Sequence, residues 1–155
     1  MLNFIRLGRI KANHNLTIPA ESIEVNALVN VSLKKLWQLW IEERHIEKWN
    51  SASDDPHTPK AVNDFSLGGR FLWRMEAKDG SMGFDFSGTY TDIVEYEYIA
   101  YTIDDGRDVL VCFNESDGQT KISQFFQPES QNSPELQKMG WQAILDHFKT
   151  YTENL

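Results

Sequence analysis

The chain has 155 residues and a formal net charge of −8, with 23 acidic and 15 basic side chains. This length corresponds to one domain of roughly 100–200 residues, and a composition that is 41% hydrophobic and 25% charged is that of a globular protein. A chain with this excess of acidic side chains lacks the positive charge that is typical of proteins that bind phosphate backbones. We therefore expect no nucleic-acid partner and no attraction to an anionic membrane.

The chain contains one cysteine, Cys112, so no internal disulfide is expected, which fits a reducing compartment. Cys112 lies in the alternating segment VLVCF, a pattern typical of a buried, inert thiol. No apolar run approaches the ~18 residues of a membrane span, and the N-terminal residues lack the apolar core of a signal peptide. A cytoplasmic protein without a membrane partner is expected.

The apolar residues of segment 1–21 recur with no clean period, and Pro19 interrupts the segment just before apolar and polar residues begin to alternate. We interpret them as an extension outside a domain that spans residues 22–155. Two alternatives stay open for this extension: a loosely packed arm, as termini often are, or an arm that packs on a neighbouring subunit.

The first part of that domain predicts a strand, two short helices and a loop. Residues 23–31 alternate as a strand, and Ser32 is a suitable N-cap for a helix over residues 33–43. A second helix is expected around residues 44–49. Residues 51–62 contain turn formers and two prolines and predict a loop. The apolar stripe of the first helix consists of Leu33, Leu36, Trp37, Trp40 and Ile41.

Alternating segments in the middle of the chain predict an antiparallel sheet with one covered face. Asp-Gly pairs at Asp79, Asp105 and Asp117 mark hairpin turns between them. The predicted strands are residues 70–78, 83–94, 98–104, 108–114 and 119–127.

A long helix is expected at the end of the chain, capped by Ser133 with Pro134 at its first position. Gly140 in its middle costs up to ~1 kcal/mol relative to alanine, which suggests close backbone approach or space left for something else. The wide apolar surface predicts that the helix lies across the sheet. It comprises one stripe of Leu136, Met139, Gly140, Ala143, Ile144, Phe148 and Tyr151, and a second of Trp141, Leu145 and Phe148.

This element order predicts an α+β fold with the helices on one face of the sheet. A strongly curved sheet that grips a helix can leave a cavity between the two.

Four segments carry a resemblance to a known family: LWQLWIEERHIEKWN (36–50), NDFSLGGRFLWRM (63–75), MEAKDGSMGFDFSGTYTDIVEYEYIAYT (75–102) and GWQAILDHFKTY (140–151). Together they resemble bacterial homologues of the C-terminal domain of the activator of heat-shock protein 90 ATPase, in the START-like (SRPBCC) superfamily. The resemblance covers about residues 22–154. One departure is Trp49-Asn50-Ser51, since many relatives have a second tryptophan and a proline there.

The resemblance implies a helix-grip fold: a curved antiparallel sheet of about six or seven strands around the C-terminal helix, with two short helices after the first strand. It also implies an apolar pocket beneath that helix. Members bind hydrophobic molecules or act as co-chaperones, and some wider relatives are cyclases or hydrolases. The family supplies no universal catalytic residue and no cofactor, and fold analogy does not choose among these functions.

Several polar side chains are candidates for a metal site or a catalytic site. Asp54, Asp55 and His57 are competent metal ligands, but their loop lacks a strict ligand spacing, so no metal is expected. His45 and His147 are interpreted as surface or rim residues of helices.

Three carboxylates in or beside the predicted strands are candidates for acid–base catalysis. Asp104 and Asp105 adjoin a turn, where aspartate is favoured for backbone reasons. Asp85 falls on the polar face of its strand, opposite the expected pocket. We therefore assign no catalytic residue.

The most informative set is aromatic and lies on faces that alternation and helical spacing direct inward. A packed core is one interpretation; the other is a ligand pocket, which is typically apolar with a few polar groups. The tyrosine hydroxyls need partners when buried, and methionines make adaptable linings. The predicted ligand-binding residues are Trp40, Trp49, Trp73, Met75, Phe84, Phe86, Tyr90, Tyr101, Met139 and Ala143.

Three functions follow as hypotheses. The first is a non-enzymatic domain that binds a hydrophobic small molecule. The second is a protein-interaction module, either a chaperone regulator or a homodimer, and the chain could be a monomer or a homodimer. The third is a polyketide cyclase-like or hydrolase-like enzyme, which would need polar side chains inside the pocket.

Overall fold

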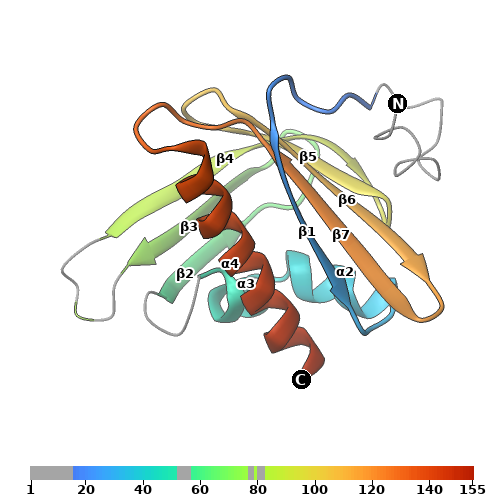
Figure 1. Ribbon diagram of the computed structural model, residues 1–155. Helices are drawn as coiled ribbons and strands as arrows, with labels where there is room; N and C mark the ends of the chain where they lie inside the picture. Colours follow the sequence, from blue (N-terminus) through green and yellow to red (C-terminus); the bar gives the residue numbers. More distant parts are fainter. Residues whose placement is uncertain (1–15, 52–56, 77–78, 80–82) are drawn as a thin grey trace.

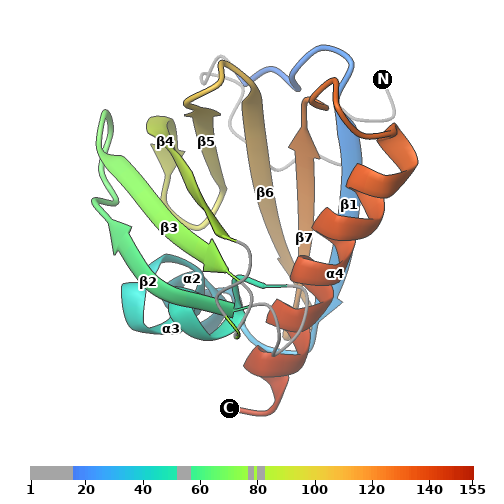
Figure 2. The same ribbon diagram turned by 90° about the vertical axis from the view of Figure 1, so that its left-hand side faces the viewer.

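The computed structural model describes residues 16–51, 57–76, 79 and 83–155. Seven antiparallel strands form one curved sheet in the order β1-β7-β6-β5-β4-β3-β2 (Figure 1). The helix α4 runs along its concave side, and α2 and α3 lie at one end (Figure 2). This is the predicted α+β helix grip. The elements are β1 (Ile23–Val29), α2 (Leu33–Ile41), α3 (Glu43–Trp49), β2 (His57–Asn63), β3 (Arg70–Glu76), β4 (Gly83–Val94), β5 (Tyr98–Ile103), β6 (Asp108–Ser116), β7 (Gln119–Phe126) and α4 (Pro134–Glu153).

Two of the three predicted Asp-Gly turns are confirmed. Asp117 and Gly118 both have positive φ, at 55° and 78°, and they join the paired residues Ser116 and Gln119, as a two-residue type I′ hairpin requires. Gly106, with a φ of 97°, donates its N–H to the carbonyl of Ile103. The third turn includes Gly80, which lies outside the described residues.

The loop prediction for residues 51–62 is wrong in its second half. His57–Asn63 form β2, an edge strand paired with β3. Pro59 lacks an N–H and is tolerated only where a strand edge or irregularity leaves that donor unneeded, and the register shifts between His57 and Lys60. Pro59 therefore marks an edge strand rather than the absence of a strand.

Both predicted helix caps are present. The Ser32 hydroxyl accepts a hydrogen bond from the Lys35 N–H, and the Ser133 hydroxyl accepts one from the Leu136 N–H. Glu42 is extended, with φ −80° and ψ 131°, and separates α2 from α3. These caps satisfy amide groups that have no partner within the helix.

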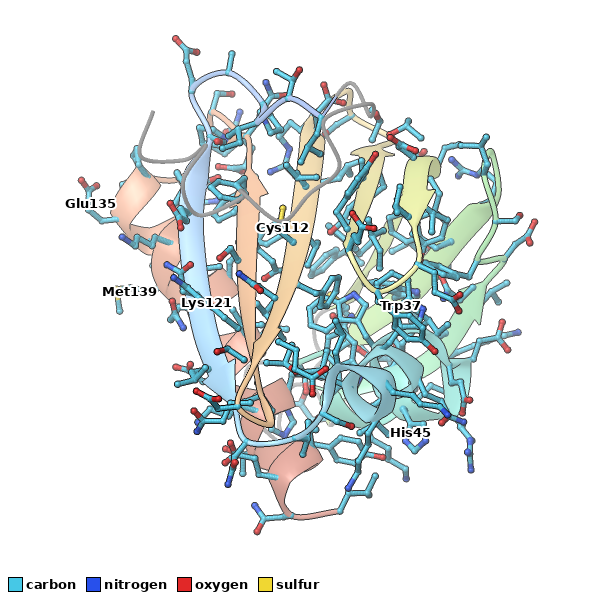
Figure 3. The ribbon with its side chains drawn as sticks, turned by 90° about the vertical axis from the view of Figure 1, so that its right-hand side faces the viewer. Trp37, His45, Cys112, Lys121, Glu135 and Met139 are labelled. Atoms are coloured by element: carbon cyan, nitrogen blue, oxygen red, sulfur yellow. The ribbon has the colours of Figure 1, made fainter. Side chains whose placement is uncertain are left out.

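The face of α4 that packs on the sheet is narrower than predicted. Its buried residues are Gln137, Leu145, Phe148 and Thr152. In contrast, Leu136 and Met139 are 55% and 68% exposed, and Figure 3 shows Met139 on the side of α4 that faces away from the sheet.

Gly140 is also exposed on α4, and a Cβ added there would meet nothing within 4 Å. Neither explanation that the sequence suggested for this glycine therefore applies. A helix lying on a sheet buries only one stripe, and here that stripe passes through Gln137 and Leu145 rather than through Gly140.

The two faces of the sheet carry separate hydrophobic clusters. The larger one lies between the concave face and the helices. The smaller one, on the convex face, includes Tyr98, Leu110 and Cys112, against which Leu16 and Ile18 pack. The end of the predicted extension thus covers part of this chain's own sheet, and residues 1–15 lie outside the described residues. No helix in the described part of the chain is long and apolar enough to span a membrane.

Candidate ligand-binding cavity

A cavity of about 230 Å³ lies between the concave face of the sheet and the three helices. Alternation along β3, β4 and β5 places every second side chain on this face, and cross-strand register sets Trp73 opposite Phe86 and Tyr90 opposite Tyr101. The predicted site residues that line the cavity are Trp40, Trp49, Trp73, Met75, Phe84, Phe86, Tyr90 and Tyr101. The structure therefore brings these eight together from α2, α3 and three strands.

Met139 and Ala143 are not among the lining residues, and their predicted placement in the wall is wrong. Met139 lies on the exposed side of α4, and Ala143 is half-buried outside the cavity lining, so other residues of the helix form that wall. The lining residues that the sequence analysis did not select are Asn50, Ile99, Arg107, Gln124, Glu129, Asn132, Gln137, Trp141, Ile144 and Leu145.

A sequence signal existed for some of these missed residues. Trp141 and Leu145 belonged to the second predicted stripe of α4, and Ile99 alternates with Tyr101. Gln124 interrupts the apolar face of β7 between Ile122 and Phe126, which is the pattern of a polar side chain placed in a core.

Trp49, at the end of α3, forms the centre of one wall. Its ring stacks on Trp40 with centroids 4.7 Å apart and meets Phe148 edge-on at 4.9 Å. Its indole N–H donates to the carbonyl of Leu39 at 2.9 Å, so the buried donor is satisfied. Trp49 therefore joins α2, α3 and α4 around the cavity.

Phe71 supports the opposite wall from behind. Its ring lies 4.8 Å from Trp73 and 5.0 Å from Tyr101, centroid to centroid. It also covers Gly88, where an added Cβ would lie 2.8 Å from the Phe71 ring and 2.4 Å from the Thr102 carbonyl oxygen. Glycine at this position therefore allows the aromatic layer to lie directly on β4.

The two tyrosines of this wall differ in their hydrogen bonds. The Tyr90 hydroxyl donates to Asn63 Oδ1, and Asn63 in turn donates to the Ile41 carbonyl, which links β4, β2 and α2. The Tyr101 hydroxyl has no hydrogen-bond partner among the described residues. Burial raises the pKa of Tyr101, against a smaller opposing effect of Arg107, so this hydroxyl stays protonated and can donate.

The charged lining residues of the cavity, Arg107 and Glu129, form hydrogen bonds and ion pairs with neighbouring groups. The Arg107 Nε lies 2.9 Å from Asp105 Oδ2. The Glu129 carboxylate accepts hydrogen bonds from the backbone N–H groups of Gln131 and Asn132. Buried Gln137 donates to the Glu129 and Asn132 carbonyls and accepts from the Glu129 N–H. These bonds order the loop that precedes α4 and forms one side of the cavity.

The carboxylates considered for catalysis do not line the cavity. Asp104 pairs with Arg70 at 2.7 Å, and hydrogen bonds from Arg70 and Ser87 hold the pKa of Asp104 well below its usual range. Asp85 pairs with Arg74 at 3.3 Å. The carboxylates of Asp104 and Asp85 therefore belong to exposed ion pairs.

The two helix histidines also bond away from the cavity wall. His45 Nδ1 lies 2.7 Å from the Tyr151 hydroxyl, and His147 Nδ1 lies 2.8 Å from the Ser51 carbonyl oxygen. No group of three potential metal ligands is present within residues 16–51, 58–76, 79 and 83–155. Asp54 and Asp55 lie outside the described residues, and only the backbone of His57 is described.

Comparisons with known proteins agree with this architecture. The family model described as "Activator of Hsp90 ATPase homolog 1-like protein" matches residues 30–153. None of the curated proteins compared with the chain matches it.

Among solved structures, the chain is similar to the AHSA1-like protein from Aeromonas hydrophila, at 38% identity and a TM-score of 0.78, with 85% of this chain and 93% of that chain covered. It is also similar to Chr148 from Cytophaga hutchinsonii, at 47% identity and a TM-score of 0.75, with 87% and 94% covered. Protein CV1439 from Chromobacterium violaceum, at 18% identity, a TM-score of 0.76 and 86% and 97% coverage, shares the fold. With its predicted helix grip confirmed and this family model matched over most of its length, the chain belongs to the Activator of Hsp90 ATPase homolog 1-like family.

Proposed function

We propose that the chain binds a small hydrophobic molecule containing rings in the cavity between the sheet and α4. The observation that carries this proposal is an open volume of about 230 Å³ walled by eight aromatic side chains. A dry apolar cavity of about 150 Å³ is known to hold benzene, so this volume suits a ligand larger than one ring. It lies below the roughly 300–1,000 Å³ of sites for drug-sized ligands, which points to about two rings.

The affinity of such a ligand follows from the area it buries. A two-ring hydrocarbon that buries about 300 Å² gains about 7.5 kcal/mol at ~25 cal/mol per Å². Association itself costs several kcal/mol, so we expect dissociation constants in the micromolar to millimolar range. Titration calorimetry and NMR at high protein concentration are suited to this range.

The test uses indane as the ligand and a pair of variants on one helix. Ile144→Trp adds a ring to a residue that lines the cavity, whereas Met139→Trp adds the same ring to the exposed side of α4. We expect Ile144→Trp to weaken indane binding about tenfold or more, with Met139→Trp close to wild type. Equal binding by wild type and a folded Ile144→Trp protein would contradict the cavity as the site.

A chaperone-related function is a second candidate, favoured by the description of the matched family and by the exposed Leu136 and Met139 on α4. In this proposal the outer face of α4 contacts a chaperone of the Hsp90 type, in the cytoplasmic location expected from the sequence. Adding the chain should raise the chaperone's ATPase rate, and Met139→Asp should reduce that effect while indane binding persists. An unchanged ATPase rate at saturating concentrations of the chain would remove this candidate.

A further inference from the structure

We propose that the ligand of this cavity carries a neutral oxygen acceptor, such as a ketone carbonyl, which Gln124 and Tyr101 bind within the aromatic enclosure. This proposal rests on the proposed small-molecule function and specifies the chemistry of that ligand.

The first observation is the buried side chain of Gln124. It lies on the concave face of β7 between Ile122 and Phe126, and it pairs across the sheet with Val25 and Val111. Gln124 is 7% exposed and lines the cavity, yet its side-chain amide has no hydrogen-bond partner among the described residues. Gln124 is not one of the residues whose unpartnered polar atoms are fully enclosed, so its amide is open to the cavity. A ligand that fills the cavity removes water from this amide, and binding is favoured where the ligand supplies a hydrogen-bond partner in return.

The second observation is the hydroxyl of Tyr101, which is 6% exposed and also lines the cavity. Its cross-strand neighbour Tyr90 already donates to Asn63. The Tyr101 hydroxyl has no such bond within the described part of the chain and remains a free donor.

Gln124 and Tyr101 lie two strands apart, on either side of β6. Val111 pairs with Gln124 and Val109 pairs with Tyr101, so the two side chains start from neighbouring rows of one concave face. Two strand spacings are roughly 10 Å, and both side chains are long. A ligand placed between them is within reach of both.

The unpartnered groups are mainly donors, which indicates an acceptor on the ligand. Tyr101 offers an O–H and Gln124 an NH₂ group. The indole N–H of Trp73, another lining residue, is buried and also lacks a partner among the described residues. A carbonyl oxygen with two lone pairs complements the donors of this set.

The acceptor is expected to be neutral. The charged side chains among the described lining residues are Arg107 and Glu129, which have opposite charges. Arg107 is paired with Asp105, and Glu129 accepts hydrogen bonds from its own loop. An ionised carboxylate in the cavity would lose its hydration without gaining a free cation, which is unfavourable.

The test compares three ligands of one shape: indane, 1-indanone and indane-1-carboxylate. Wild type should bind 1-indanone about tenfold more tightly than indane, the effect of one to two net hydrogen bonds, and more tightly than the carboxylate. Gln124→Leu and Tyr101→Phe should each reduce the preference for indanone over indane about threefold, measured as the ratio of the two dissociation constants within each variant.

Unfolding of the same variants provides an independent check. Because neither removed group has a hydrogen-bond partner among the residues that the structure describes, both variants should unfold at or above the wild-type temperature. A large drop in the unfolding temperature of Gln124→Leu would show that the Gln124 amide has a structural partner in the wild-type protein, and would overturn the proposal.

The outcomes separate the two proposals. If wild type binds neither indane nor indanone, the proposed function fails, and this inference fails with it. If wild type binds both equally, and the variants change nothing, the hydrophobic site stands and the acceptor subsite is overturned. Tighter binding of the carboxylate than of indanone would overturn the neutral acceptor.

Discussion

Trp141 of α4 stacks face to face on Phe126 of β7, with ring centroids 4.0 Å apart and ring planes inclined by only 5°. Phe126 is fully buried and belongs to the concave core, whereas Trp141 is half-buried and lines the cavity. The contact therefore fixes α4 against the sheet at the wall of the proposed site.

Replacing Trp141 with alanine should lower the free energy of unfolding by about 2–4 kcal/mol, somewhat less than a fully buried tryptophan. Urea denaturation measures this loss. The matched control is Met139→Ala, on the exposed face of the same helix, which should lie within about 0.5 kcal/mol of wild type. Similar losses in both variants would show that the stack does not anchor α4.

Gly88→Ala should destabilise the protein by about 1–3 kcal/mol. The added methyl group would approach the Thr102 carbonyl oxygen to 2.4 Å and the Phe71 ring to 2.8 Å, and neither the backbone nor the packed ring moves easily. Thermal unfolding followed by circular dichroism measures the effect. An unchanged melting temperature would mean that the layer of Phe71 on β4 is looser than described.

Gly140→Ala should have the opposite sign and stabilise the protein by about 0.5–1 kcal/mol. This glycine lies within α4, is exposed and has open space around its missing Cβ. The alanine reduces the backbone freedom of the unfolded chain without a steric cost in the folded one. Urea denaturation checks this, and a loss of stability would indicate a close neighbour of α4.

His45 should make stability fall as the pH drops below about 6.5. Burial, and then the charge of Arg44, lower the pKa of His45 from its ordinary value of 6.5, with Glu42 acting in the opposite direction. The unfolded chain therefore binds a proton more readily than the folded one at this site, so acid favours unfolding. Denaturation between pH 7.5 and pH 5 should show a shallower decline for His45→Gln than for wild type. Equal declines of stability in His45→Gln and wild type would exclude His45 as the source of this pH dependence.

The strands of the sheet were predictable because their signals are local. Side chains alternate from Arg70 to Phe126, and Asp-Gly pairs mark turns whose positive φ the structure confirms at Gly106 and Gly118. The edge strand β2 was missed because Pro59 reads as a loop signal, although an edge position removes the penalty for its missing N–H.

The residues that line the cavity were predictable on the strands, and the prediction for α4 was wrong. Trp73, Phe86 and Tyr101 follow from alternation, which admits only two faces. The predicted placement of Met139 and Ala143 in the cavity wall was wrong because α4 carries apolar residues over more of its circumference than the sheet covers. The spacing of apolar residues alone therefore allowed several rotations of the helix about its axis.

The sequence by itself determined the order of the elements other than β2, the helix caps, the hairpin turns at Gly106 and Gly118 and the family. Each of these depends on residues close together in the chain or on a motif read along it. Only the tertiary structure decided the rotation of α4, the edge position of β2 and the placement of the Gln124 amide and the Tyr101 hydroxyl in the cavity lining, without hydrogen-bond partners among the described residues. These features depend on which distant surfaces meet, and side-chain packing selects one arrangement among several that the local pattern allows.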